Sequence, residues 1–234
     1  MSSLQETRYA DGTYLENNPT WHEEDSVQKV VWIERFLRKN RITPRTIAEV
    51  GCGAGGILAG MQQHFPQARL SGYEISPQAY AIAQGKANES LEIHHQDILQ
   101  VDHEPFDLLM AIDVFEHVPD YLDFITRLRG RAQCKLFHVP LDLSVRMLLQ
   151  PRIFTEIRAD LGHLHYFNKT TTLDTLTYCG YEIVDHAYTY WSLDYPSLSL
   201  KSRLAKIPRR LFARIAPDLA MSVLGGGSML VLTR

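Results

Sequence analysis

The chain has 234 residues, of which 45% are apolar and 22% are charged. This composition excludes a disordered chain and a small disulfide-stapled protein, because it can bury a sizeable core unaided. The net charge of −3 argues against a general nucleic-acid binder. The three cysteines are widely separated and no apolar run approaches the length of about 20 residues that a membrane span needs. We therefore expect a cytoplasmic protein from a reducing compartment.

The first 45 residues are predicted to form an arm and a leading helix. Residues 1–20 are polar and contain turn-forming pairs such as Asp11-Gly12. From Asp25 to about Asn40, apolar residues recur at helical spacing. Residues 46–234 then form the main part of what we expect to be a single domain.

Beyond residue 45, extended and helical segments alternate. Short apolar runs predict seven strands, over residues 46–50, 69–75, 91–95, 106–113, 135–139, 181–191 and 228–232. Helical spacing, capping residues and prolines predict helices over residues 57–65, 78–87, 119–129 and 168–178. Such alternation predicts an α/β fold with a parallel sheet and helices on both of its faces.

Two long insertions, residues 141–167 and 192–224, interrupt this alternation. In the first, we expect a helical piece that Asp142 caps and Pro151 ends. In the second, Pro208 and Pro217 are predicted to open new helical pieces. Connections of this length in a compact domain often carry function.

The second insertion is strongly basic. Between residues 195 and 217 there are six cations and no acid, so this segment carries +6 and the remaining chain −9. The basic face of this segment is either solvated on a helical lid or in contact with an anionic substrate or membrane surface. We place such a contact at residues 201–214. RNA binding is disfavoured because Phe212 is the only aromatic residue among the basic ones.

A glycine-rich loop, Gly51-Cys52-Gly53-Ala54-Gly55-Gly56, lies between the first predicted strand and the next helix. Glycines in this position let backbone N–H groups approach a ligand at a helix N-terminus. Their spacing also fits GxGxxG, so an NAD-dependent oxidoreductase stays open at this point. The acid at Glu49 favours a cationic ligand, because a carboxylate there would repel a pyrophosphate.

Three further acids follow the glycine loop at the ends of successive predicted strands. Glu74 follows Gly51 by 23 residues, Asp97 follows Glu74 by 23 and Asp113 follows Asp97 by 16. In this order and at these intervals, the motifs resemble those of the class I S-adenosylmethionine-dependent methyltransferases over about residues 46–140. The resemblance implies a Rossmann-like seven-stranded sheet whose last strand is antiparallel, and S-adenosyl-L-methionine as the cofactor.

The resemblance also implies which residues bind the cofactor. They lie at the ends of the first four strands: Glu49, Gly51, Cys52, Gly53, Gly55, Glu74, Ile75, Asp97, Ile98, Ile112, Asp113 and Phe115. In the family, the glycine loop makes room for the methionine part and the acid matching Glu74 accepts the ribose hydroxyls. The Asp matching Asp97 receives the adenine amino group, Asp113 lies near the cofactor's amino group, and Phe115 or Val118 packs near the adenine.

The methyl acceptor is expected to be an oxygen of a small-molecule or lipid-like metabolite. An oxygen acceptor needs a base, and the candidates are His163 and His165, which close the first insertion, and His117. Asp113, Glu116 and His117 together with one of these histidines resemble cation-holding clusters of plant-type small-RNA 2′-O-methyltransferases. We nevertheless expect no metal.

Three alternatives to this function remain at the sequence level. The chain would be a catalytically silent cofactor-binding module, an RNA 2′-O-methyltransferase or the NAD-dependent oxidoreductase that the glycine loop permits. The intact loop together with Glu74 and Asp97 argues against a silent module. Neither the acceptor nor the oligomeric state follows from the sequence.

Overall fold

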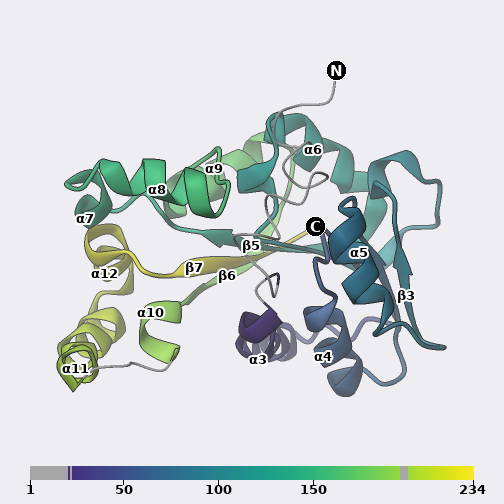
Figure 1. Cartoon of the computed structure of the whole chain (residues 1–234), viewed down its shortest axis with the longest axis horizontal. Coiled ribbons are helices and arrows are strands. Elements are labelled where there is room, and N and C mark those ends of the chain that lie inside the picture. The colour runs from purple at the N-terminus through teal and green to yellow at the C-terminus, as the bar shows by residue number, and fades with distance from the viewer. Residues whose placement is uncertain (1–20, 22, 196–199) are drawn as a thin grey trace.

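The computed structural model describes residue 21, residues 23–195 and residues 200–234; the predicted arm at residues 1–20 lies outside them. A seven-stranded sheet runs through the molecule in the order β3-β2-β1-β4-β5-β7-β6 (Figure 1). The strands are β1 (Thr46–Val50), β2 (Arg69–Tyr73), β3 (Leu91–His94), β4 (Phe106–Ile112), β5 (Ala132–Pro140), β6 (Ile183–Thr189) and β7 (Ser228–Thr233).

The strand directions confirm the predicted topology. Strand β1 pairs in parallel with both β2 and β4, and β7 is antiparallel to both β5 and β6. Because the chain order reverses between β1 and β4, their carboxyl ends open a crevice, which is where ligands bind in sheets of this kind. The site is therefore expected at this edge of the sheet.

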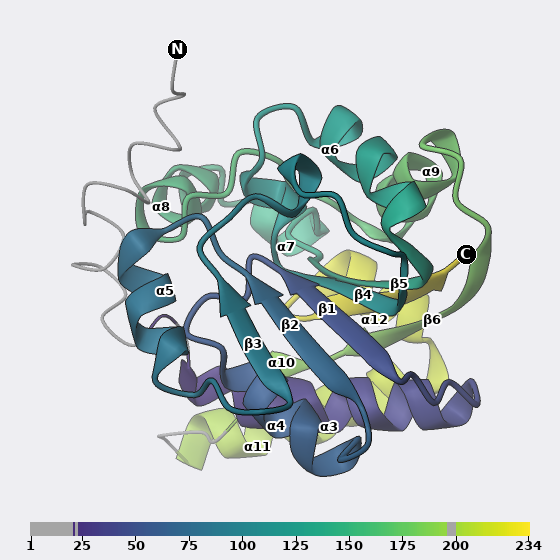
Figure 2. The same ribbon diagram turned by 90° about the vertical axis from the view of Figure 1, so that its right-hand side faces the viewer.

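Helices cover both faces of the sheet, as predicted (Figure 2). One face is covered by α3 (Glu23–Lys39), α4 (Gly56–His64) and α5 (Pro77–Gln84), and the other by α6 (Tyr121–Leu128) and α9 (Lys169–Tyr178). Each helix buries an apolar face, for example Ile33 and Leu37 of α3 or Ile125 and Leu128 of α6. Two apolar clusters, one on each side of the sheet, form the core.

The two insertions form the helices that lie on the left in Figure 1. Residues 141–167 contain α7 (Val145–Leu148) and α8 (Arg152–Asp160), and residues 192–224 contain most of α10 (Trp191–Asp194) with α11 (Leu200–Ile215) and α12 (Pro217–Leu224). None of the described helices is long and apolar enough to cross a membrane.

Two sequence expectations about the insertions are wrong. Asp142 does not cap α7; the Ser144 side chain accepts from the Met147 N–H at 3.4 Å, while Asp142 pairs with His163. Pro208 does not open a new helix, because α11 continues through it. The ring fits the helical φ angle, and the helix tolerates the missing N–H at a position exposed to solvent. Pro217 does open α12, as predicted.

Candidate functional site

A cavity of about 1040 Å³ opens at the carboxyl ends of β1, β2 and β4. Most of the predicted site residues line it: Glu49, Gly51, Cys52, Gly53, Glu74, Ile75, Asp97, Ile98, Ile112, Asp113, His117 and His163. Helix α3 and the two insertions supply its other walls. The motifs spread over residues 49–118 thus meet in one place together with residues from both insertions.

The glycine loop bends under the cavity in a conformation that favours glycine. Gly51, Gly53 and Gly55 have φ angles of 65°, 53° and 77°, in the left-handed region. The Gly51 N–H donates to the Tyr73 carbonyl at 2.8 Å, which holds the loop against the end of β2. A Cβ at Gly53 would meet nothing within 4 Å, so this side of the loop is open to a ligand.

The Glu74 carboxylate is buried and holds the loop in place. One of its oxygens accepts from the Gly53 N–H at 2.9 Å and the other from the Ser76 N–H at 2.8 Å. Burial raises the pKa of Glu74, although these backbone hydrogen bonds act in the opposite direction. The predicted ribose-binding acid therefore stands at the cavity wall with its orientation set by backbone donors.

Glu49 is buried at the end of β1, and its Oε2 has no hydrogen-bond partner among the described residues. Burial raises the pKa of this carboxyl well above its usual range; Lys29 lowers it, while Glu74 and Asp113 raise it further. A buried oxygen without a partner is costly, and a donor from a bound ligand would remove that cost.

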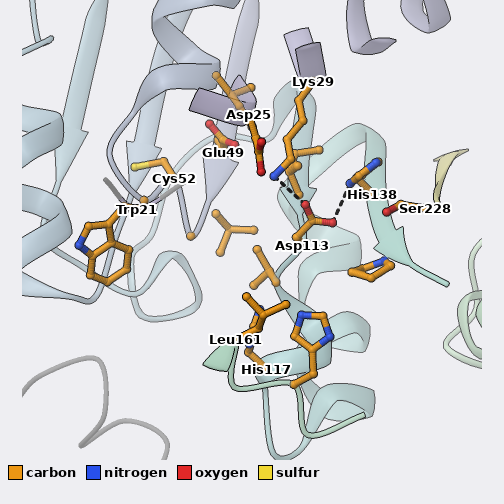
Figure 3. Close-up of a pocket in the computed structure, with 18 of the residues that line it drawn as sticks. Trp21, Asp25, Lys29, Glu49, Cys52, Asp113, His117, His138, Leu161 and Ser228 are labelled. Carbon is orange, nitrogen blue, oxygen red and sulfur yellow. Dashed lines mark hydrogen bonds and ion pairs between the residues drawn. The ribbon is translucent and has the colours of Figure 1, made fainter. Parts of the chain in front are cut away.

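Asp113 lies between Lys29 and His138 and interacts with both of these side chains (Figure 3). Its carboxylate accepts from Lys29 Nζ at 2.9 Å and from His138 Nδ1 at 2.7 Å, and His138 Nε2 lies 2.9 Å from the Thr189 hydroxyl. Burial alone would raise the pKa of Asp113, but His138 and Lys29 together hold it well below its usual range. Its φ of 54° is a strained conformation that Asp tolerates better than most residues.

Lys29 lines the cavity and pairs with Asp113, and sequence reasoning missed it. Burial would lower its pKa, but attraction to Asp113, the hydrogen bond to that carboxylate and the nearby charges of Asp25 and Glu116 together raise it. Asp25, Lys29 and Trp32 follow one another at helical spacing and all line the cavity. A cation on an otherwise buried face of the leading helix was the available signal, but its partner 84 residues away could not be identified from the sequence.

Asp97 caps the short turn Ile98–Gln100 at the cavity edge. Its side chain accepts from the Leu99 N–H at 2.9 Å and from the Gln100 side chain at 3.1 Å. These bonds fix the carboxylate next to the fully buried Ile98. Both residues line the cavity just beyond the end of β3.

Three predicted site residues do not line the cavity. Gly55 is buried against Ala83 of α5. Phe115 is fully buried in the core, so of the two residues expected near the adenine only Val118 borders the cavity. His165 is held away from the cavity by a 3.0 Å contact with the Val118 carbonyl oxygen. The two-residue spacing therefore did not bring both histidines into the acceptor region.

His163, in the first insertion, lines the cavity and is oriented by an acid. Its Nδ1 lies 2.8 Å from Asp142 Oδ2, and its ring stands edge-on to the His117 ring at a centroid distance of 4.9 Å. Ligand atoms of Glu116, His117 and His163 lie within 4.8 Å of one another, close enough for one divalent cation. Burial and, second to it, the charge of Asp113 raise the pKa of Glu116 well above its usual range.

The cavity as a whole fits a cationic cofactor. Glu49, Glu74 and Asp113 line the cavity next to the glycine loop, a part that we call the inner half, and Lys29 forms an ion pair with Asp113. A ligand that carries a sulfonium and an amino group would offset this excess of acids. The open side of Gly53 and the unpartnered Glu49 oxygen provide the space and the acceptor for it.

Comparisons with known proteins agree with this site. Residues 48–134 match the family described as "Methyltransferase domain". Trans-aconitate 2-methyltransferase of Streptomyces coelicolor is 31% identical over 86 residues, which cover 34% of this chain and 28% of that protein. Release factor glutamine methyltransferase of Enterococcus faecalis is 32% identical over 83 residues, 34% of this chain and 30% of that protein. The matched stretch thus spans less than a third of these curated relatives.

Solved structures resemble the chain over most of its length. The plantazolicin methyltransferase BpumL, solved with SAH, has a TM-score of 0.60 at 17% identity and covers 99% of this chain and 93% of its own. Magnesium protoporphyrin IX methyltransferase from Synechocystis PCC 6803, also with SAH, has a TM-score of 0.59 at 15% identity and covers 94% and 86%. At these identities the likeness shows the fold. Residues 48–134 therefore match a methyltransferase domain, and the chain as a whole has the fold of these solved methyltransferases.

Proposed function

We propose that this protein transfers a methyl group from S-adenosyl-L-methionine to an oxygen of a small-molecule or lipid-like metabolite. The observation that carries the proposal is the Asp142–His163 pair, which shares one cavity with the cofactor-side acids Glu74 and Asp113. The cofactor, when bound, supplies a methyl group on a sulfonium, which needs an acceptor in line and no further activation. What remains for the chain is to bind, to orient and to remove a proton.

The inner half of the cavity is suited to holding the cofactor. Glu74 and the loop at Gly53 form one rigid wall, because the carboxylate and the backbone N–H are bonded to each other. Asp113, held by Lys29 and His138, provides a charged carboxylate opposite this wall. Such preorganised groups lose little freedom on binding.

His163 is the residue that we assign as general base. The Asp142 carboxylate accepts the Nδ1–H, which leaves Nε2 as the proton acceptor for a hydroxyl. His117 borders the same space and remains a second candidate. His165 is not supported in this role, because it is engaged with a backbone carbonyl outside the cavity.

The part of the cavity that we assign to the methyl acceptor, and call the acceptor side, is largely apolar. Side chains from α3, from the first insertion and from the start of α10 line it: Trp32, Met147, Ile153, Ile157, Leu161 and Trp191. Arg146 is a cation at its edge. An acceptor with an apolar body and a polar or anionic group matches this lining, and the name of the Streptomyces relative supports a small organic acceptor.

Calorimetry with S-adenosyl-L-methionine and with its demethylated product tests the cofactor half of the proposal. We expect both to bind, and Glu74→Gln to weaken both at least tenfold, since it removes the charge that orients Gly53. Binding of neither compound by the wild-type chain overturns the proposal. Tighter binding of a nicotinamide dinucleotide would favour the oxidoreductase instead.

Incubation with the methyl-labelled cofactor and a lipid and metabolite extract tests transfer itself. With a labelled product in hand, Asp142→Asn should lower kcat about 100-fold and leave the affinity for the demethylated product unchanged. Asp123→Asn is the matched control, because that exposed acid on α6 contacts only its own helix. No product from any fraction would favour a silent binding module.

A further inference from the structure

Helix α11 carries its apolar side toward solvent. Four large aliphatic residues lie on one side of it and are exposed to 57%, 64%, 59% and 74%: Leu204, Ile207, Leu211 and Ile215. Their spacing of three or four residues places them in one line along the helix, and we call them the aliphatic stripe. In a helix that packs against a protein core, such a line would face inward.

Polar side chains hold the inner side of α11 to the protein instead. Lys206 and Arg210 donate to the Leu193 carbonyl at 3.1 and 3.0 Å. Arg209 donates to the Gly225 carbonyl just after α12. Hydrogen bonds from cations to backbone carbonyls therefore fix the orientation of the helix, and this orientation leaves the stripe on the outside.

Exposed cations flank the stripe. Arg203 and Arg214 are exposed, α11 contains no acid, and neither arginine forms an ion pair with a described acid. A line of aliphatic side chains bordered by arginines is the pattern of a helix that lies on an anionic lipid surface. The apolar part enters the interface while the guanidinium groups contact the headgroups.

The neighbouring helices extend this surface. Helix α12 packs against both α11 and α7, and the three lie together at one end of the molecule (Figure 1). Each of the other two also has exposed aliphatic residues, Leu219 on α12 and Leu148 on α7, and Leu149 follows directly. Arg146 and Met147, one turn or less away, line the cavity, so this end of the molecule adjoins the acceptor side.

We propose that the aliphatic stripe of α11, with the exposed apolar residues of α7 and α12, docks on an anionic lipid bilayer. A second copy of the chain fits less well, because a two-fold contact would bring the arginine rows of both copies together. A nucleic acid fits less well because Phe212, only partly exposed, is the one aromatic residue on α11. The inference does not depend on methyl transfer, and it is tested without cofactor.

Sedimentation with vesicles tests the proposal on the full chain. We expect binding to phosphatidylcholine vesicles that contain about 30% phosphatidylserine to be at least tenfold tighter than binding to pure phosphatidylcholine, and to weaken with added salt. Ile207→Ser with Leu211→Ser should weaken it at least tenfold, because these side chains enter the interface. Arg203→Gln with Arg214→Gln should weaken it at least fivefold on the charged vesicles alone.

Matched variants elsewhere on the surface distinguish this docking from non-specific adsorption to vesicles. Val27→Ser with Val184→Ser removes two exposed aliphatic residues, and Arg45→Gln with Arg69→Gln removes two exposed cations, both away from α11. These controls should bind as the wild type does, with unchanged circular dichroism in all variants. No vesicle binding, binding that the stripe variants retain, or a dimer that the stripe variants dissociate would each overturn the proposal.

Discussion

The ion pair between Lys29 and Asp113 joins the leading helix to the site, and its removal has a predictable cost. We consider Lys29→Met, Asp113→Asn and the double variant. Methionine keeps most of the lysine stem, and asparagine tolerates the left-handed φ of 54° nearly as well as aspartate does. The two changes therefore remove charge with little change in packing or backbone preference.

The magnitude follows from the partial burial of the pair. The two side chains are 17% and 22% exposed, and the charged atoms are 2.9 Å apart. Exposed ion pairs contribute up to about 1 kcal/mol, whereas breaking a fully buried pair costs about 3–5 kcal/mol. Because Asp113 keeps its hydrogen bond from His138, we expect a coupling energy of about 2 kcal/mol between Lys29 and Asp113.

Urea denaturation of the four proteins at pH 7 measures this coupling in a double-mutant cycle. The pH dependence provides an independent check. The pKa of Asp113 is lowered in the folded state, so its stabilisation is complete above its ordinary value of 3.8 and is lost as the pH falls further. The pKa of Lys29 is raised, so its contribution is complete below 10.5 and is lost as the pH rises through the folded value.

The coupling energy between Lys29 and Asp113, which is the difference that the cycle isolates, should accordingly have its full size between about pH 5 and pH 9 and shrink outside that range. A coupling energy below about 0.5 kcal/mol would refute the reasoning, since the two charges would then not interact in solution. So would a difference that grows on acidification.

Three further predictions concern the same cavity. Above pH 4.5, the free energy of unfolding, measured with urea, should decrease less steeply with pH in Glu116→Gln than in the wild type. Burial raises the pKa of Glu116, so its ionisation costs folding free energy as the pH rises. The same slope in both proteins would contradict this. Treatment with EDTA should leave methyl transfer unchanged, and a loss that Mg²⁺ restores would instead assign a cation to Glu116, His117 and His163. Gly53→Ala should lower the free energy of unfolding by about 1 kcal/mol through its φ of 53°, and should weaken cofactor binding in calorimetry because the added methyl group enters the cavity.

Features that depend on short stretches of sequence were predictable. The glycine loop and the acids at residues 74, 97 and 113 each follow a strand, and the carboxyl ends of parallel strands meet at one edge of a sheet. The cofactor half of the cavity therefore followed from order and spacing once the alternation of strands and helices was recognised. The basic segment at residues 195–217, with its six cations, was equally visible, because charge does not depend on the fold.

Features that depend on distant partners were not predictable in the same way. The cap of α7 is Ser144 and not Asp142, because His163 in a later segment takes the Asp142 carboxylate. The contacts of His138 with Asp113 and Thr189 join β5 to the end of β4 and to β6, which are far apart in the chain. A single sequence contains no record of which polar residues a fold brings together.

Helix α11 shows the same limit for orientation. Helical spacing predicts that Leu204, Ile207 and Leu211 share one side, but periodicity does not say whether that side faces the core or the solvent. The usual expectation is that the apolar side is buried. Here the cationic side forms hydrogen bonds to the backbone carbonyls of residues 193, 224 and 225, so the helix faces the protein with its cationic side and solvent with its apolar side. The charge pattern and the outward stripe then have one explanation, because a basic helix held by its polar side presents its apolar side, and its remaining arginines, to the same external surface.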